Sequence, residues 1–141
     1  MNAFTSASMV LALSAIATVA VAEEFDGSVP MDCTALKGHD CLPTENKCNR
    51  LKPESDVAPV FGIDVAKKEV RSPFRTSVLP IQHVTQNKDS VVLQGTDLQF
   101  AWSAVIHRTK GTMTITVADR KGAYVVFGQC KVAGTSPASA P

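Results

Sequence analysis

The sequence predicts an all-β domain. It is expected to be an antiparallel meander of five to six strands that forms a small barrel or sandwich, joined by disulfides and placed after an N-terminal signal peptide. Three observations lead to this prediction. Short segments in the second half of the chain alternate apolar and polar side chains, the turns between them are short and polar, and four cysteines follow an apolar N-terminal segment.

The composition is that of one folded domain. The chain has 141 residues, of which 45% are hydrophobic and 19% are charged, and its formal net charge is +1. A charge near zero gives no reason to expect a nucleic-acid partner or a polybasic membrane anchor. The hydrophobic content is too high for a disordered chain.

The N-terminal segment has the order of an export signal. Residues 9–21 are apolar apart from Ser14 and Thr18, and residues 20–22 form a small-x-small cleavage site followed by Glu23. This apolar run is too short to cross a bilayer, which needs ~20 residues. We therefore expect residues 1–22 to be a signal peptide and the mature protein to be periplasmic or secreted, with no integral membrane segment. Because residues 1–8 lack Lys and Arg, a buried or interfacial N-terminal helix is the alternative.

Export into an oxidising compartment predicts that the four cysteines form disulfides. They are Cys33, Cys41, Cys48 and Cys130. We favour Cys33–Cys130 with Cys41–Cys48, because Pro43 between the latter two makes a turn there. Cys33–Cys41 with Cys48–Cys130 is the alternative pairing.

A metal site and a redox site are the competing interpretations of the cysteines. The first three are separated by seven and six residues, whereas zinc sites usually contain a C-x₂₋₄-C pair, and no C-x-x-C redox sequence is present. His39, which lies between the first two cysteines, keeps a metal site open as an alternative. We predict no metal and no cofactor.

The strands follow the disulfide region in regular succession. The second of them contains Pro80, which favours an edge strand or a bulge at that point. The expected strands are residues 60–65, 74–84, 90–94, 98–107, 112–117 and 123–127. The expected turns are residues 67–69, 87–89, 107–111 and 119–122. Before these strands, residues 34–38 are expected to form at most one helical turn.

The last forty residues alternate most clearly. Gly111 ends a short hairpin loop and suits a residue with positive φ. The expected inward side chains of the last strands are Leu98, Phe100, Trp102, Ala104, Ile106, Met113, Ile115 and Val117. Gly62, Gly95 and Gly128 are expected at bulges or bends that let the sheet curl. Residues 23–133 then form a single disulfide-bonded β domain, and residues 134–141 a disordered tail. A bridge from Cys33 to the final strand favours the barrel.

The C-terminal pattern resembles that of a group of proteins. Residues 102–106, 111–114 and 123–130, together with the cysteine-bearing N-terminus and the signal peptide, are similar to uncharacterised small exported proteins of Gram-negative bacteria, mainly alphaproteobacteria. The resemblance implies a periplasmic or secreted setting and no activity.

No catalytic motif is found. The sequence lacks a G-x-S-x-G nucleophile elbow, a Gly-rich phosphate loop and an H-E-x-x-H helix, so we predict that the protein is not an enzyme. Its histidines, His39, His83 and His107, are scattered singly. An enzyme with an unrecognised site in which His83 and His107 meet is an alternative.

Cationic residues offer two further candidates. The basic loops 107–111 and 119–122 are expected at opposite ends of the sheet. A second group near the first turn is either a solvated face or a contact for an anionic glycan or lipid head group. Its members are Lys67, Lys68, Arg71 and Arg75.

The expected function is therefore a non-enzymatic binding or interaction role, with an unknown protein or a small-molecule or glycan ligand. We expect a monomer. A periplasmic inhibitor of a lysozyme or a protease is the alternative, for which residues 43–47 or 85–89 are the candidate inhibitory loops.

Overall fold

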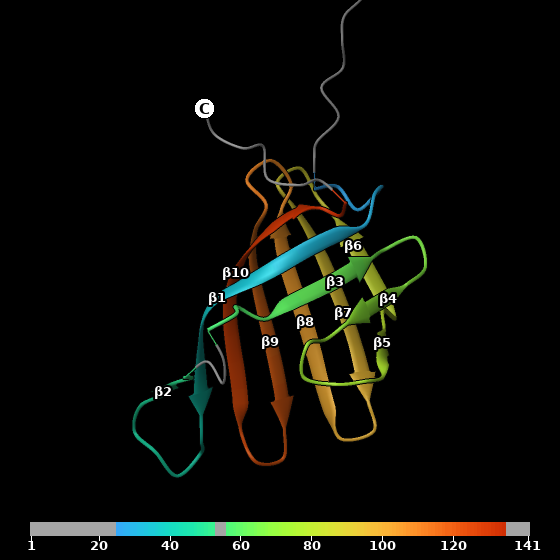
Figure 1. Cartoon of the computed structure of the whole chain (residues 1–141). Helices are drawn as coiled ribbons and strands as arrows, with labels where there is room; N and C mark the ends of the chain where they lie inside the picture. Colours follow the sequence, from blue (N-terminus) through green and yellow to red (C-terminus); the bar gives the residue numbers. More distant parts are fainter. Residues whose placement is uncertain (1–24, 53–55, 135–141) are drawn as a thin grey trace, which may run out of the picture.

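The computed structural model describes residues 25–52 and 56–134, and these residues form ten strands and no helix (Figure 1). The strands are β1 (Met31–Cys41), β2 (Asn49–Arg50), β3 (Val60–Asp64), β4 (Glu69–Arg71), β5 (Val78–Pro80), β6 (His83–Gln86), β7 (Ser90–Asp97), β8 (Phe100–His107), β9 (Thr112–Asp119) and β10 (Ala123–Val132). The predicted signal peptide and, apart from Gly134, the predicted C-terminal tail lie outside the described residues.

All strand pairs are antiparallel and belong to one curled sheet. Its order is β5-β4-β3-β1-β10-β9-β8-β7-β6, and β2 pairs with β1 outside this path. The predicted fold class is confirmed, and of the two expected forms the sheet takes the barrel-like one. β1 lies between β3 and β10, so the first strand joins the last strand to the rest of the sheet.

The two margins of the curled sheet are consecutive in the chain. β5 pairs with β4 and β6 pairs with β7, with only two residues between β5 and β6. In this connection the Ile81 N–H donates to the Lys68 carbonyl at 2.8 Å, and the Gln82 N–H donates to the Gln94 carbonyl at 2.9 Å. Pro80 is the last residue of β5, after which the chain leaves β4 and begins to pair with β7. Proline has no N–H to donate and therefore suits the end of a strand.

Gly95 on β7 allows the two margins to approach each other. A Cβ atom at this position would collide with the Pro80 carbonyl oxygen and would lie 2.7 Å from the indole of Trp102.

Gly111 has a φ of 65°, as predicted for its hairpin loop. The register shift lies elsewhere, in β1 between Ala35 and Lys37, and not at the three glycines expected to mark bulges or bends.

The prediction for the N-terminal region was wrong. Residues 34–38, expected to form at most a helical turn, lie inside the eleven-residue strand β1. The bulge at Leu36 interrupts the alternation, because one extra residue moves the following side chains to the other face. The prediction also did not separate β4 from the turn before it, and it gave five to six strands where the described residues form ten.

The core fills the inside of the curl. Its fully buried side chains include Met31, Leu93 and Ile106, and Trp102 is 6% exposed. The predicted inward residues of the last strands are buried or partly buried with one exception. Leu98, expected to face the core, is 99% exposed because it lies in the turn between β7 and β8.

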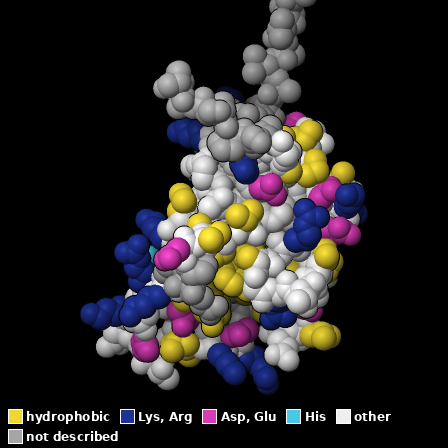
Figure 2. Space-filling model, viewed as in Figure 1, with side chains coloured by type: hydrophobic (Ala, Val, Ile, Leu, Met, Phe, Trp, Pro, Cys, Tyr) yellow, Lys and Arg dark blue, Asp and Glu magenta, His cyan; other side chains and the backbone are white. Residues whose placement is uncertain are grey.

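Charged side chains of both signs are scattered over the face of the molecule shown in Figure 2. Hydrophobic side chains gather near the centre of this view. The side of the sheet formed by β7–β10 lies behind β1, β3 and β4 in Figure 1.

Candidate functional site

A disulfide-closed loop extends beyond the sheet at the end of β1 (Figure 1). Cys41, the last residue of β1, is bonded to Cys48, just before β2. We call residues 42–47 the disulfide loop. Its residues from Pro43 onward are exposed, so the loop adds nothing to the core.

Hydrogen bonds fix the shape of the disulfide loop. The Glu45 N–H donates to the Leu42 carbonyl at 3.1 Å, which closes a turn, and the Asn49 side-chain amide donates to the Glu45 carboxylate. Behind the loop, β2 pairs with His39 and Asp40 of β1. The loop is thus fixed at both ends by strand pairing and by a covalent bond.

The turn between β9 and β10 lies next to the disulfide loop. Asp119 accepts hydrogen bonds from the backbone N–H groups of Lys121 at 2.7 Å and Gly122 at 3.0 Å. These bonds stabilise the ionised carboxylate and hold the pKa of Asp119 below its ordinary value of 3.8. A Cβ atom on Gly122 would lie 2.6 Å from the Cys41 carbonyl oxygen, so the turn and the end of β1 are in close approach.

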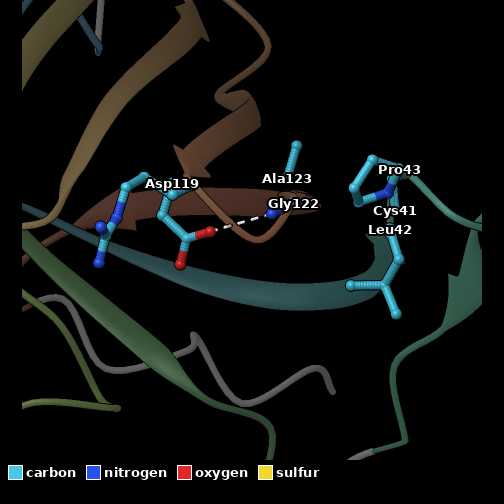
Figure 3. A pocket seen from close by; sticks show the side chains of 7 residues that line it. Cys41, Leu42, Pro43, Asp119, Gly122 and Ala123 are labelled. Carbon is cyan, nitrogen blue, oxygen red and sulfur yellow. Dashed lines mark hydrogen bonds between the residues drawn. The ribbon is translucent and has the colours of Figure 1, made fainter.

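A shallow depression of about 390 Å³ lies between the disulfide loop and this turn. Figure 3 shows Leu42 and Pro43 on one side, Asp119 on the other, and Gly122 and Ala123 between them. Arg120 also lines it. Apolar side chains beside a guanidinium and a carboxylate suit an apolar group that carries a charge or a hydrogen-bonding group. We call the disulfide loop and residues 119–122 together the loop end.

The four cysteines form the two disulfides that the sequence analysis favours. Cys33 is bonded to Cys130 and Cys41 to Cys48, and no cysteine in the described residues is free. Cys33 is 0% and Cys130 3% exposed, and they lie opposite each other on β1 and β10. Two disulfides indicate an oxidising compartment.

The strand register does not bring the histidines together. His83 lies opposite Gln94 and His107 opposite Ser90, on the two strands that flank β7. Their Cα atoms are therefore about 16 Å apart, given a rise of about 3.3 Å per residue and strands about 4.8 Å apart. His39 lies on β1 with its ring edge-on to Phe127. The alternative of a site built from His83 and His107 has no support in this arrangement.

The predicted cationic group near the first turn is split. Lys67 and Lys68 lie in the turn before β4, whereas Arg75 lies after the C-terminal end of β4. Lys67 forms an ion pair with Asp64 at 3.2 Å, and Arg75 pairs with Asp97 at 3.2 Å and covers the Phe100 ring. The basic loops 107–111 and 119–122 lie at opposite ends of β9, as expected.

Two buried polar atoms on the inner side of the sheet have no hydrogen-bond partner among the described residues. They are Oδ1 of Asp40 on β1 and Nε1 of Trp102 on β8.

Within the described residues, no group of three His, Cys, Asp or Glu side chains is placed to hold a metal ion. The same residues contain no helix of the length and apolar character that a membrane span requires.

Arg120 and Leu42 were not predicted to share one site. Residues 41–48 and 119–122 were predicted as separate turns, and only the pairing of β1 with β10 brings them together.

Comparisons with protein-family models, with curated proteins and with solved structures find no match to the chain.

Proposed function

We propose that the protein is a non-enzymatic binding domain of the periplasm or the extracellular space, and that it contacts a partner protein with the loop end. One observation carries this proposal. The Cys41–Cys48 disulfide closes a loop whose residues from Pro43 onward are exposed and lie outside the core. Closing such a loop fixes the shape of a surface more than it holds the sheet together.

A fixed loop lowers the free-energy cost of binding. A flexible loop loses conformational entropy when a partner immobilises it, whereas a loop closed beforehand has already lost most of that freedom. In the chain-entropy model, an eight-residue closure removes roughly 2.5 kcal/mol of entropy from the open chain. The depression beside the loop adds a concave contact area lined by Leu42, Pro43 and Arg120.

The proposal is tested by affinity capture with matched variants. Immobilised wild-type protein, Arg120→Ala and Lys88→Ala are exposed to an extract of exported proteins, and bound proteins are quantified by mass spectrometry. Lys88 lies in the turn before β7, at the opposite end of the sheet from Arg120, and both side chains are exposed. We expect a partner that wild type and Lys88→Ala retain and Arg120→Ala loses. A partner retained equally by all three proteins would remove the loop end from the proposal.

An inhibitor of a lysozyme or a protease is the second candidate function. The exposed, closed loop 42–47 suits insertion into an enzyme cleft. Its turn between Leu42 and Glu45 favours a lysozyme, because proteases bind substrate-like loops in extended form. The other candidate loop, residues 85–89, is reduced to a three-residue turn, because β6 continues to Gln86 and β7 begins at Ser90. Assays of lysozymes, serine proteases and metalloproteases with the purified protein test this role, and unchanged rates throughout would exclude it.

A further inference from the structure

Along β7–β9 and residues 123–129 of β10, the positions that alternate outward carry no Asp, Glu, Lys or Arg, and the next outward position of β10 is Lys131. Burial alternates along these strands, and the register places the outward residues of neighbouring strands side by side. We call this surface the neutral face. Its residues are Ser90, Val92, Gln94, Thr96, Ala101, Ser103, Val105, His107, Thr112, Thr114, Thr116, Ala118, Ala123, Val125, Phe127 and Gln129.

Such a surface is unusual for a sheet exposed to water. The solvent side of an antiparallel sheet normally carries polar residues, charged ones included. Here its middle is formed by Val105, which is 43% exposed, and Phe127, which is 36% exposed, with Thr114 between them in the register. On the side of β1, the Lys37 amino group lies 5.2 Å from the centre of the Phe127 ring and marks the charged margin of the face. Loss of charged residues with retention of an aromatic is the composition found at the centre of protein interfaces.

We propose that the neutral face binds a second copy of this chain, face to face, as a symmetric dimer, in place of the monomer expected from the sequence. In a two-fold interface each side chain near the axis meets its own copy, so a charged residue there would face a like charge. The outward positions of β8 and β9, at the middle of the face, carry no charge and meet their own copies at no such cost. Ser and Thr hydroxyls both donate and accept hydrogen bonds and can therefore pair with their own copies.

The face is just large enough for a dimer interface. With the four residues of β6 at its margin, it covers about 35 strand residues, or roughly 550 Å² at the usual strand spacing and rise. A face-to-face dimer would then bury about 1,100 Å² in total, slightly more than the roughly 1,000 Å² that a biological interface should exceed. The face adjoins the depression only at Ala123, so the disulfide loop stays outside the interface and each dimer presents two loop ends.

Sedimentation equilibrium of the purified protein over a range of concentrations tests the dimer. Val105→Glu and Thr114→Glu place a charge at neighbouring points on the two middle strands, β8 and β9. Val60→Glu is the matched control, since Val60 is also a strand valine, 43% exposed, but lies on β3.

We expect wild type and Val60→Glu to dimerise with the same Kd, and each face variant to raise that Kd by about 100-fold, because like charges then face each other. Thermal melts recorded in parallel establish that each variant is folded. A wild-type protein that stays monomeric at every concentration overturns the proposal. So do two folded face variants that dimerise as tightly as wild type.

Discussion

The two halves of β1 differ in what surrounds their cysteines. Cys33 is fully buried in the half that β3 and β10 flank, and its bond to Cys130 spans a sequence separation of 97 residues. Cys41 ends the other half, and its bond to Cys48 spans only 7 residues, which are mostly exposed. The first disulfide closes the sheet, whereas the second shapes a surface. The same bond therefore serves stability in one half and, in our proposal, recognition in the other.

The largest expected effect is the loss of the buried disulfide. In the chain-entropy model, a crosslink that closes about 100 residues stabilises a protein by roughly 4.7 kcal/mol. Cys33→Ala combined with Cys130→Ala is expected to lower the free energy of unfolding by about that amount, measured by urea denaturation followed by circular dichroism. If the loss were no larger than that caused by removing the other disulfide, the two halves would not differ as described.

A loss of the same size or smaller is expected from truncating a core side chain in the same half of β1. Met31 is 0% exposed, so Met31→Ala should cost about 2–5 kcal/mol, the usual cost of a large-to-small change in a core. Leu36, in the bulge of the same strand, is 68% exposed, and Leu36→Ala should change stability by less than about 0.5 kcal/mol. Equal losses from the two substitutions in urea denaturation would contradict the burial of this half.

Removal of the exposed disulfide is expected to cost about 2.5 kcal/mol at most, the value of an eight-residue closure in the same model. The far-ultraviolet spectrum of Cys41→Ala combined with Cys48→Ala should keep its β form, while partner capture by the loop end should fall. A variant that binds its partner as wild type does would leave this disulfide without the role proposed for it.

The smallest expected effect is on the free energy of unfolding at low pH. Asp119 has a lowered pKa, because the N–H groups of Lys121 and Gly122 bond to its carboxylate; the same holds for Asp64, bonded by the Lys67 N–H. A carboxyl that is more acidic in the folded state stabilises the protein above its unfolded pKa, and this contribution is lost as the pH falls below about 3.8.

Asp119→Asn should therefore make the free energy of unfolding fall less steeply between about pH 4 and pH 2 than it does in wild type. The exposed Asp56→Asn is the control, and acid titration followed by circular dichroism is the measurement. An unchanged slope in Asp119→Asn would show that these hydrogen bonds do not persist in solution.

The sequence predicted those parts of the fold that have a local signal. Met113, Ile115 and Val117 alternate strictly with threonines, which specifies β9 and its buried face. The strand β1 was missed because its bulge at Leu36 breaks the alternation, and its burial depends on pairing with β10, about ninety positions further along the chain. Leu98 was wrongly predicted to face the core because the alternation of β8 was extended backward by one step, into the turn between β7 and β8.

The candidate site was predicted only in part. The cysteine spacing and Pro43 predicted the disulfide loop. Nothing local links Leu42 to Arg120, because their proximity follows from the register of β1 against β10. The neutral face likewise depends on which residues stand side by side across four strands, and that arrangement exists only after folding.

The difference between the two disulfides is tested most directly by graded reduction. The protein is treated with increasing reductant, new thiols are trapped by alkylation, and the modified cysteines are identified by peptide mass spectrometry. The exposed Cys41–Cys48 bond should open first, with the circular dichroism of the sheet unchanged, and Cys33–Cys130 should open only as the sheet unfolds. If Cys33 and Cys130 were alkylated first, or all four cysteines together, the division of β1 into a buried and an exposed half would be contradicted.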